Sequence, residues 1–222
     1  MFRITRIAPL VLLGFMVAVQ PAVAGPPLLC HPFDIGAARS LPWDGSQSWS
    51  HGRADYNRQN LIADTAALLT PSTPVIVRME TLRRAALYAS EDAAVAARLL
   101  AMVNERAARG AERAATADPG TSLALFDAGY LTATFKQIAA LGGMSAEFRG
   151  RSRTAAGVLK GADGYALLTK SIALRPDDPA LQFAAALVSA DNNRAAYQQH
   201  AAKARQGADK DALLTRNLKH IS

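Results

Sequence analysis

The chain has 222 residues, a formal net charge of +7 and a single cysteine. One cysteine excludes an internal disulfide, so the folded state must be stabilised by packing. The basic residues are spread along the chain rather than gathered in a tail, and no nucleic-acid-binding motif is present. These features exclude nucleic acid as the expected partner.

The first 24 residues have the pattern of a secretory signal. Arg3 and Arg6 precede an apolar run over residues 7–19, and the small-x-small sequence Ala22-Val23-Ala24 follows. The run is shorter than the roughly 20 residues that a membrane-spanning helix needs. We therefore predict cleavage after Ala24 and a periplasmic or secreted mature chain without a transmembrane anchor.

Residues 25–56 differ in composition from the rest of the chain. They are rich in proline and glycine and contain both tryptophans, Trp43 and Trp49. Proline prevents a long helix here, while the apolar residues would be too exposed in a free tail. We predict an ordered strap packed on the body, with the two tryptophans as its main contacts. The alternative is that Trp43 and Trp49 form an aromatic surface for a partner.

The stretch GPPLLCHPFDIGAARSLPW, residues 25–43, resembles the start of a group of uncharacterised exported bacterial proteins with helical-repeat bodies. That resemblance implies a helical body after the strap. It implies no activity.

Cys30 and His31 are adjacent and could provide two ligands of a metal site. Zinc sites need three or four ligands, and the other histidines are scattered along the sequence. We expect Cys30 to be inert. The alternatives are a disulfide-linked homodimer through Cys30, or metal binding or catalysis by Cys30 and His31 with a carboxylate such as Asp34.

From residue 54 the chain has apolar residues at helical spacing. This spacing predicts a helix over residues 54–69 and a second one that begins at Pro74, with Thr73 as its N-cap. On the second helix Glu80 and Arg84 form an i,i+4 pair. Ser90 is predicted to cap the next helix, which ends near Gly110.

A helix over residues 122–141 is predicted to be packed from two sides. Its apolar residues cover about half of its circumference, at 100° per residue. Asp127 lies near the centre of this apolar arc, where an unpaired carboxylate would be costly. We expect Asp127 to pair with a basic residue of a neighbouring helix. The alternative is that it lines a pocket together with Tyr130, one turn away.

Residues 142–161 contain five glycines and the alternating arginines Arg149, Arg151 and Arg153. This composition predicts a solvated basic loop. The alternative is a surface that contacts an anionic partner or membrane head groups.

Two further helices are predicted around a turn at Pro176. The first carries Gly164, Leu168 and Ser171, and the second begins at Asp178-Pro179. The small, large apolar, small pattern before a helix-ending proline resembles the junction between two tetratricopeptide repeats. A final helix is predicted after Asp209.

Together these patterns predict an all-α protein, an irregular array of antiparallel tetratricopeptide-like helix pairs. Its domains are the signal peptide (1–24), the strap (25–56) and the helical-repeat body (57–222). Because no catalytic, phosphate-binding or cofactor motif appears, we expect a non-enzymatic module that binds a protein or peptide and needs no cofactor. An exported enzyme or metal-binding protein based on Cys30 and His31 is the alternative.

Overall fold

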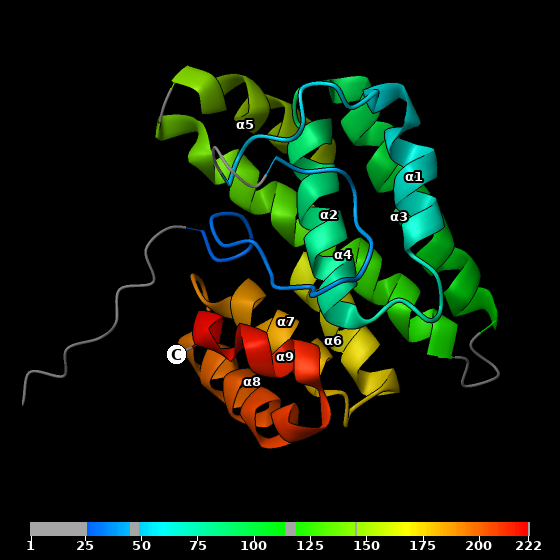
Figure 1. Ribbon diagram of the computed structural model, residues 1–222, viewed down its shortest axis with the longest axis vertical. Coiled ribbons are helices and arrows are strands. Elements are labelled where there is room, and N and C mark those ends of the chain that lie inside the picture. The colour runs from blue at the N-terminus through cyan, green and yellow to red at the C-terminus, as the bar shows by residue number, and fades with distance from the viewer. Residues whose placement is uncertain (1–25, 45–48, 114–118, 145, 222) are drawn as a thin grey trace, which may run out of the picture.

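A computed structural model describes residues 26–44, 49–113, 119–144 and 146–221 (Figure 1). Within these ranges the chain is all-α, as predicted, and its one β-type pairing is an isolated bridge between Trp43 and Gly52. The helices are η1 (Arg58–Asn60), α1 (Leu61–Leu68), α2 (Val75–Ala89), α3 (Ala93–Arg113), α4 (Pro119–Ala140), η2 (Leu141–Gly143), α5 (Ala146–Leu159), α6 (Gly164–Leu174), α7 (Pro179–Ser189), α8 (Arg194–Gly207), η3 (Ala208–Lys210), α9 (Ala212–Asn217) and η4 (Leu218–Ile221).

Helix α4 occupies the centre of the array. It contacts α2, α3, α5, α6 and α7, so its wide apolar arc is covered from several sides. Phe126, Tyr130 and Phe135 are fully buried along it. The predicted packing of this helix from two sides is confirmed.

Helix α2 is the other enclosed element, and every residue on it except Arg84 is buried. Helices α1, α3, α4 and α7 contact it. The irregular segment (residues 26–44 and 49–57), drawn blue to cyan in Figure 1, runs along its remaining side. A hydrogen bond between the Ser40 and Thr81 hydroxyl groups and one from the Tyr88 hydroxyl to Pro42 O join this segment to α2.

The α4–α6 contact depends on small residues. A Cβ atom at Gly129 would lie 2.7 Å from Gly164 O, so the two backbones can approach this closely only with glycine at the crossing. Two turns away, Ser122 and Ser171 exchange hydrogen bonds between hydroxyl and carbonyl groups. Gly164 and Ser171, two positions of the repeat-like pattern, therefore form the face of α6 that meets α4.

The turn between α6 and α7 follows the prediction. Helix α6 ends at Leu174, and α7 begins at Pro179. The Asp178 carboxylate accepts the backbone N–H groups of Ala180 and Leu181. An acceptor before a proline at the first helical position is sufficient to fix this boundary.

The predicted loop over residues 142–161 is wrong, because residues 146–159 form helix α5. Gly150 and Gly157 lie within this helix, and a Cβ atom at either would meet no other atom within 4 Å. They face open space and break no packing contact. Each costs about 1 kcal/mol of helix propensity relative to alanine, which the packing of Phe148 and Ala155 against the core offsets.

The predicted N-cap at Ser90 is also wrong. The Ser90 hydroxyl donates back to Leu87 O within α2. Asp92 caps α3 instead, and its carboxylate accepts the N–H groups of Ala94 and Val95. A serine at a helix end can accept an N–H of the next helix or donate to a carbonyl of the helix before it. Here the Ser90 hydroxyl donates to the preceding helix.

Three other boundaries shift. Residues 54–57 are not helical, so α1 begins at Leu61. The Thr73 hydroxyl donates to Leu68 O rather than capping α2. Asp211, not Asp209, caps α9 by accepting the N–H groups of Leu213 and Leu214.

The two ends of the described chain meet. Asp34 N donates to Asn217 Oδ1, and Asn217 Nδ2 donates to Asp34 O, both at 2.9 Å. This reciprocal pair joins the start of the chain to α9 (Figure 1). The predicted signal peptide, residues 1–24, lies outside the described residues. None of the described helices has both the length and the hydropathy needed to cross a membrane.

Candidate functional site

A buried acidic side chain organises the contact between α2 and residues 26–57. Glu80 is fully buried and accepts four hydrogen bonds. Arg83 Nε and Nη2 donate to its two oxygens at 2.8 Å, Arg84 Nε donates at 2.6 Å, and Phe33 N donates at 3.1 Å. Burial acts to raise the pKa of the Glu80 carboxyl, but the hydrogen bonds and charges of Arg83 and Arg84 hold it below its ordinary value.

The two arginines of this Glu80 cluster (Glu80, Arg83 and Arg84) extend to the irregular segment. Arg83 Nη1 donates to Trp49 O at 2.9 Å and to Leu29 O at 3.2 Å, and Arg84 Nη1 donates to Leu41 O at 2.6 Å. Carbonyl groups outside regular structure thus find donors in the protein interior. The predicted i,i+4 pair of Glu80 and Arg84 is confirmed, whereas the role of Arg83 was not predicted.

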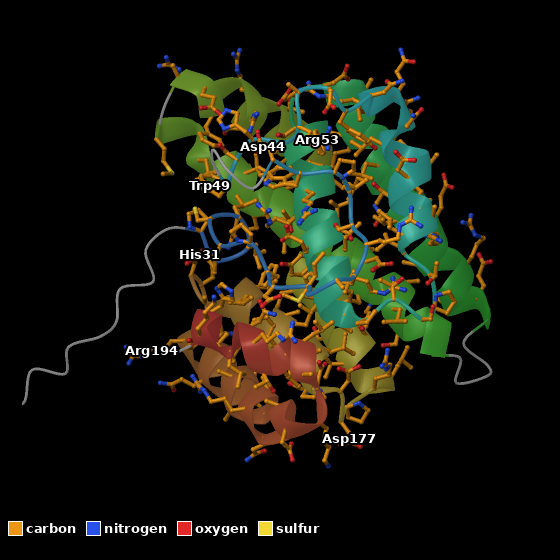
Figure 2. All side chains as sticks on the ribbon, viewed as in Figure 1. His31, Asp44, Trp49, Arg53, Asp177 and Arg194 are labelled. Carbon is orange, nitrogen blue, oxygen red and sulfur yellow. The ribbon has the colours of Figure 1, made fainter. Side chains whose placement is uncertain are left out.

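Both tryptophans lie against helices and are half-buried. The Trp43 ring packs edge-on against Tyr88, and the Arg83 guanidinium lies 4.9 Å from its centroid. Trp49 stacks on Phe148 of α5, with centroids 5.4 Å apart and planes 10° apart. Trp49 is labelled in Figure 2, below α5 in this view.

The other predicted carboxylate site is an ion pair between helices. Asp127 of α4 is 3% exposed, and its Oδ2 accepts a 2.6 Å hydrogen bond from Arg78 Nη1 of α2. Arg78 also donates to Thr73 O, at 3.0 Å, and to Thr70 O. The expected pair with a basic residue of a neighbouring helix is therefore present.

Asp127 differs from Glu80 in the number of its donors. Its Oδ1 is buried and accepts no hydrogen bond within the described parts of the chain. Burial raises the pKa of this carboxyl from 3.8 to about 6, and the Arg78 and Arg106 charges only partly oppose the change.

Tyr130, predicted as the companion of Asp127 in a pocket, is fully buried and stacks on Phe126 at 5.5 Å. Burial raises the pKa of its hydroxyl well above 10. The residue belongs to the core and lines neither of the two cavities described below.

The three arginines expected in a basic loop lie on α5 and have different environments. Arg149 and Arg153 are exposed. Arg151 is 9% exposed, and it donates to Ser50 O at 2.9 Å and to Glu91 Oε1 at 2.7 Å. Arg151 therefore connects α5 to the irregular segment and to the turn between α2 and α3, because the helical period turns it toward the body.

Cys30, His31 and Asp34 do not form a metal centre. Among the described residues no three histidine, cysteine or acidic side chains are placed to hold an ion. The His31 ring lies 5.7 Å from that of His220, and Asp34 lies near Arg216 and bonds to Asn217. Partial burial raises the pKa of the Cys30 thiol, with Arg83 opposing, which disfavours the reactive thiolate.

A polar chain not predicted from the sequence links α6, α7 and α8. The Tyr165 hydroxyl lies 2.9 Å from His200 Nε2, and His200 Nδ1 lies 2.7 Å from Gln182 Oε1. Gln182 Nε2 donates to Pro176 O, which orients the amide oxygen toward the histidine. This orientation gives the neutral ring its proton on Nδ1 and makes Nε2 the acceptor from Tyr165. Residues separated by 18 and 35 positions leave no local signal of such a chain.

Two cavities of similar size lie at different places in the array. One, of about 290 Å³, lies between the ends of α2, α3 and α4 and is lined by Arg78, Arg106, Arg109 and Asp127 among others. The second, of about 280 Å³, lies between α4, α6 and the α7–α8 turn and is lined by Leu28, Tyr165 and Val188 among others.

The predicted site residues are thus distributed over three places. Trp43 and Trp49 are on the irregular segment, Asp127 borders the first cavity, and Arg149 and Arg153 are on the outside of α5. Comparison of the chain with protein-family models, with curated proteins and with solved structures gives no significant match.

Proposed function

We propose that this chain is an exported, non-enzymatic module that binds a partner protein or peptide, built as an irregular tetratricopeptide-like array with residues 26–56 as an N-terminal strap. The signal sequence over residues 1–24 supports export. The small-residue face of α6, with Gly164 and Ser171 against α4, supports the repeat-like packing.

The strap proposal is supported by the contacts of Glu80, Arg83 and Arg84. These side chains satisfy the N–H of Phe33 and the carbonyl groups of Leu29 and Leu41. Leu28, Leu29, Phe33 and Leu41 are each at most 3% exposed. Bonded and buried in this way, the segment acts as a fixed layer over α2.

The observation that carries the binding proposal is the composition of the surface around α5. Met144, just before the helix, is 63% exposed, the highest value among the large apolar side chains that the structure describes. Arg149 and Arg153 are exposed one turn apart, and the half-buried Trp49 lies against the same helix. Methionine, arginine and tryptophan are the residues enriched at protein interfaces, and two arginines favour an acidic partner.

The test is site-specific crosslinking in the producing cell. A photo-crosslinking residue at position 153 should give a defined adduct with one acidic protein, and the isolated adduct should begin at Gly25. Replacing Arg149 by Glu should abolish the adduct and leave the unfolding midpoint unchanged, because this side chain is exposed.

The matched control is the same crosslinker at position 98, an exposed arginine position on α3. Equal adducts from positions 98 and 153, or an adduct that survives Arg149→Glu, would reject the α5 surface as the binding site. An adduct that begins at Met1 would reject signal cleavage.

A further inference from the structure

The cavity between α4, α6 and the α7–α8 turn has buried, mostly apolar walls and a polar rim. Leu28, Ala133 and Gly164 are buried lining residues, and Val188 is half-buried. Exposed polar side chains from three elements form the rim: Lys136 on α4, Asp163 before α6, and Asp191, Asn192 and Asn193 in the α7–α8 turn. Apolar walls with a few polar groups are typical of a small-molecule site.

Gln137 gives this cavity a buried donor whose hydrogen bonding is incomplete. Its Oε1 accepts the Leu28 N–H at 2.9 Å, which fixes the orientation of the carboxamide. Among the described residues its Nε2 then has one acceptor, Asp191 Oδ2, at the long distance of 3.4 Å. Gln137 is 9% exposed and lines the cavity. Its second N–H therefore needs an acceptor that a ligand in the cavity can supply.

The rim side chains are held in place but retain hydrogen-bonding capacity. Asp163 Oδ1 caps α6 by accepting the N–H groups of Tyr165 and Ala166, and Asn193 Oδ1 caps α8 by accepting that of Ala196. Capping through one atom leaves the second Asp163 oxygen and the Asn193 amide nitrogen for other partners. Acceptors and donors therefore lie side by side on a fixed rim.

Tyr165 adds an aromatic wall to the cavity. Its hydroxyl lies 2.9 Å from His200 Nε2, and His200 Nδ1 lies 2.7 Å from Gln182 Oε1. This polar chain fixes the side chain in the absence of a ligand, which reduces the entropic cost of binding. Because the hydroxyl is engaged with His200, the ring is left to contact the apolar part of a ligand.

We propose that this cavity binds one neutral sugar ring. Each sugar hydroxyl is a donor and an acceptor at one oxygen, which fits a rim where Gln137 and Lys136 donate while Asp163 and Asp191 accept. The C–H face of the ring fits the Tyr165 side chain. A volume of about 280 Å³ lies at the lower end for ligand pockets, which favours a single ring over a longer saccharide.

The rim also disfavours ligands of either charge. Lys136 repels a cation, whereas Asp163 and Asp191 repel an anion. A neutral ligand with several hydroxyl groups encounters neither repulsion.

This site is separate from the α5 surface. No described residue of α5 lines the cavity, and neither Met144 nor Trp49 does. The sugar proposal therefore does not rest on partner binding at α5, and the two experiments fail separately.

The test is NMR titration of the full mature chain with D-glucose, D-galactose and D-mannose. We expect saturable binding of at least one of them, with a dissociation constant of about 1–10 mM, because one ring makes few contacts. Asp191→Ala should raise this constant about tenfold, since it removes a charged acceptor. The matched control is Asp209→Ala, an exposed aspartate of η3 that does not line the cavity, and it should leave binding unchanged.

Two substitutions of Tyr165 test the aromatic contact. Tyr165→Phe retains the ring and should keep the dissociation constant within about twofold, whereas Tyr165→Leu should abolish saturable binding. The unfolding midpoint of each variant shows that it is folded under the titration conditions. Equal binding by the two folded variants would overturn the ring contact.

Ethanolamine and glycerol are the competing probes. Ethanolamine binding more tightly than all three sugars would identify a cation site, and glycerol binding as tightly as the sugars would show that no ring is recognised. Either result overturns the proposal. Absence of saturable sugar binding, or equal loss in the Asp191 and Asp209 variants, overturns the site.

Discussion

Glu80 and Asp127 are both buried carboxylates paired with arginines of α2, but their environments have opposite effects. Glu80 accepts four hydrogen bonds, and its pKa is lowered. Asp127 accepts one, and its pKa is raised to about 6. Burial disfavours the charged form of both, so the number of donors decides which form is stable.

This difference separates two structural roles. Both Glu80 oxygens accept hydrogen bonds, and the Glu80 cluster bonds to the backbone of Leu29, Phe33, Leu41 and Trp49. The Arg78–Asp127 pair is incompletely bonded and borders a cavity. A buried ion pair that is saturated is expected to be a rigid contact, whereas an unsaturated one leaves a buried acceptor that lacks a hydrogen-bond donor.

The largest expected effect comes from breaking the saturated cluster. Glu80→Gln keeps the side-chain volume but leaves the fully buried Arg83 without a counter-charge, which should lower the free energy of unfolding by about 3–5 kcal/mol. Chemical denaturation measures this loss. Limited proteolysis should show faster cleavage between Leu28 and Arg53.

The control for this prediction is Glu105→Gln, which removes a surface ion pair and should cost less than about 1 kcal/mol. If both variants lose the same small amount, the Glu80 cluster does not hold the strap.

A smaller loss is expected for Asp127→Ala, about 1–3 kcal/mol. The Arg78 guanidinium then loses one acceptor but keeps Thr70 O and Thr73 O, and water entering from the cavity can replace the carboxylate. Denaturation of the single variants and of the double variant with Arg78→Met measures the coupling between the two residues. Strictly additive losses would show that they do not interact.

The smallest expected effect is a pH dependence. The folded pKa of Asp127, about 6, lies above the ordinary value of 3.8, so the folded state retains a proton that the unfolded state releases between these values. The stabilising contribution of Asp127 is therefore complete below pH 3.8 and is lost as the pH rises through 6.

Other groups oppose this trend. Burial lowers the pKa of His220 from 6.5 to about 4. The contribution of His220 to the free energy of unfolding therefore rises between pH 4 and 6.5, where the contribution of Asp127 falls. The measurement is therefore the difference in unfolding free energy between Asp127→Asn and the wild type. Between pH 5 and 6.5 the unfolding free energy of Asp127→Asn should rise by about 1 kcal/mol relative to that of the wild type. A constant difference would show that the Asp127 pKa is not raised.

Local signals in the sequence were sufficient for some elements and not for others. The α6–α7 turn was predicted because Asp178 and Pro179 determine a helix start by themselves. Helix α5 was missed because Gly150 and Gly157 suggest a loop, and only the folded structure shows that both face open space. A low helix propensity is overridden when the face of the helix opposite the glycines packs against the core.

The candidate site shows the same limit. The position of Asp127 in an apolar arc predicted a buried pair, but the partner, Arg78, lies 49 residues away and could not be identified. Glu80 and Arg84 were assigned to a helix face by spacing alone. Their burial depends on a segment that begins more than 50 residues earlier in the chain and could not be inferred from the helix itself.

The reciprocal hydrogen bonds between Asp34 and Asn217 close the array into a ring of contacts. Repeat proteins with free ends gain or lose units because each unit touches only its neighbours. In this chain Asn217→Ala would remove both hydrogen bonds and separate Asp34 from α9. The position of the segment before α1 therefore depends on a side chain 183 positions later in the sequence.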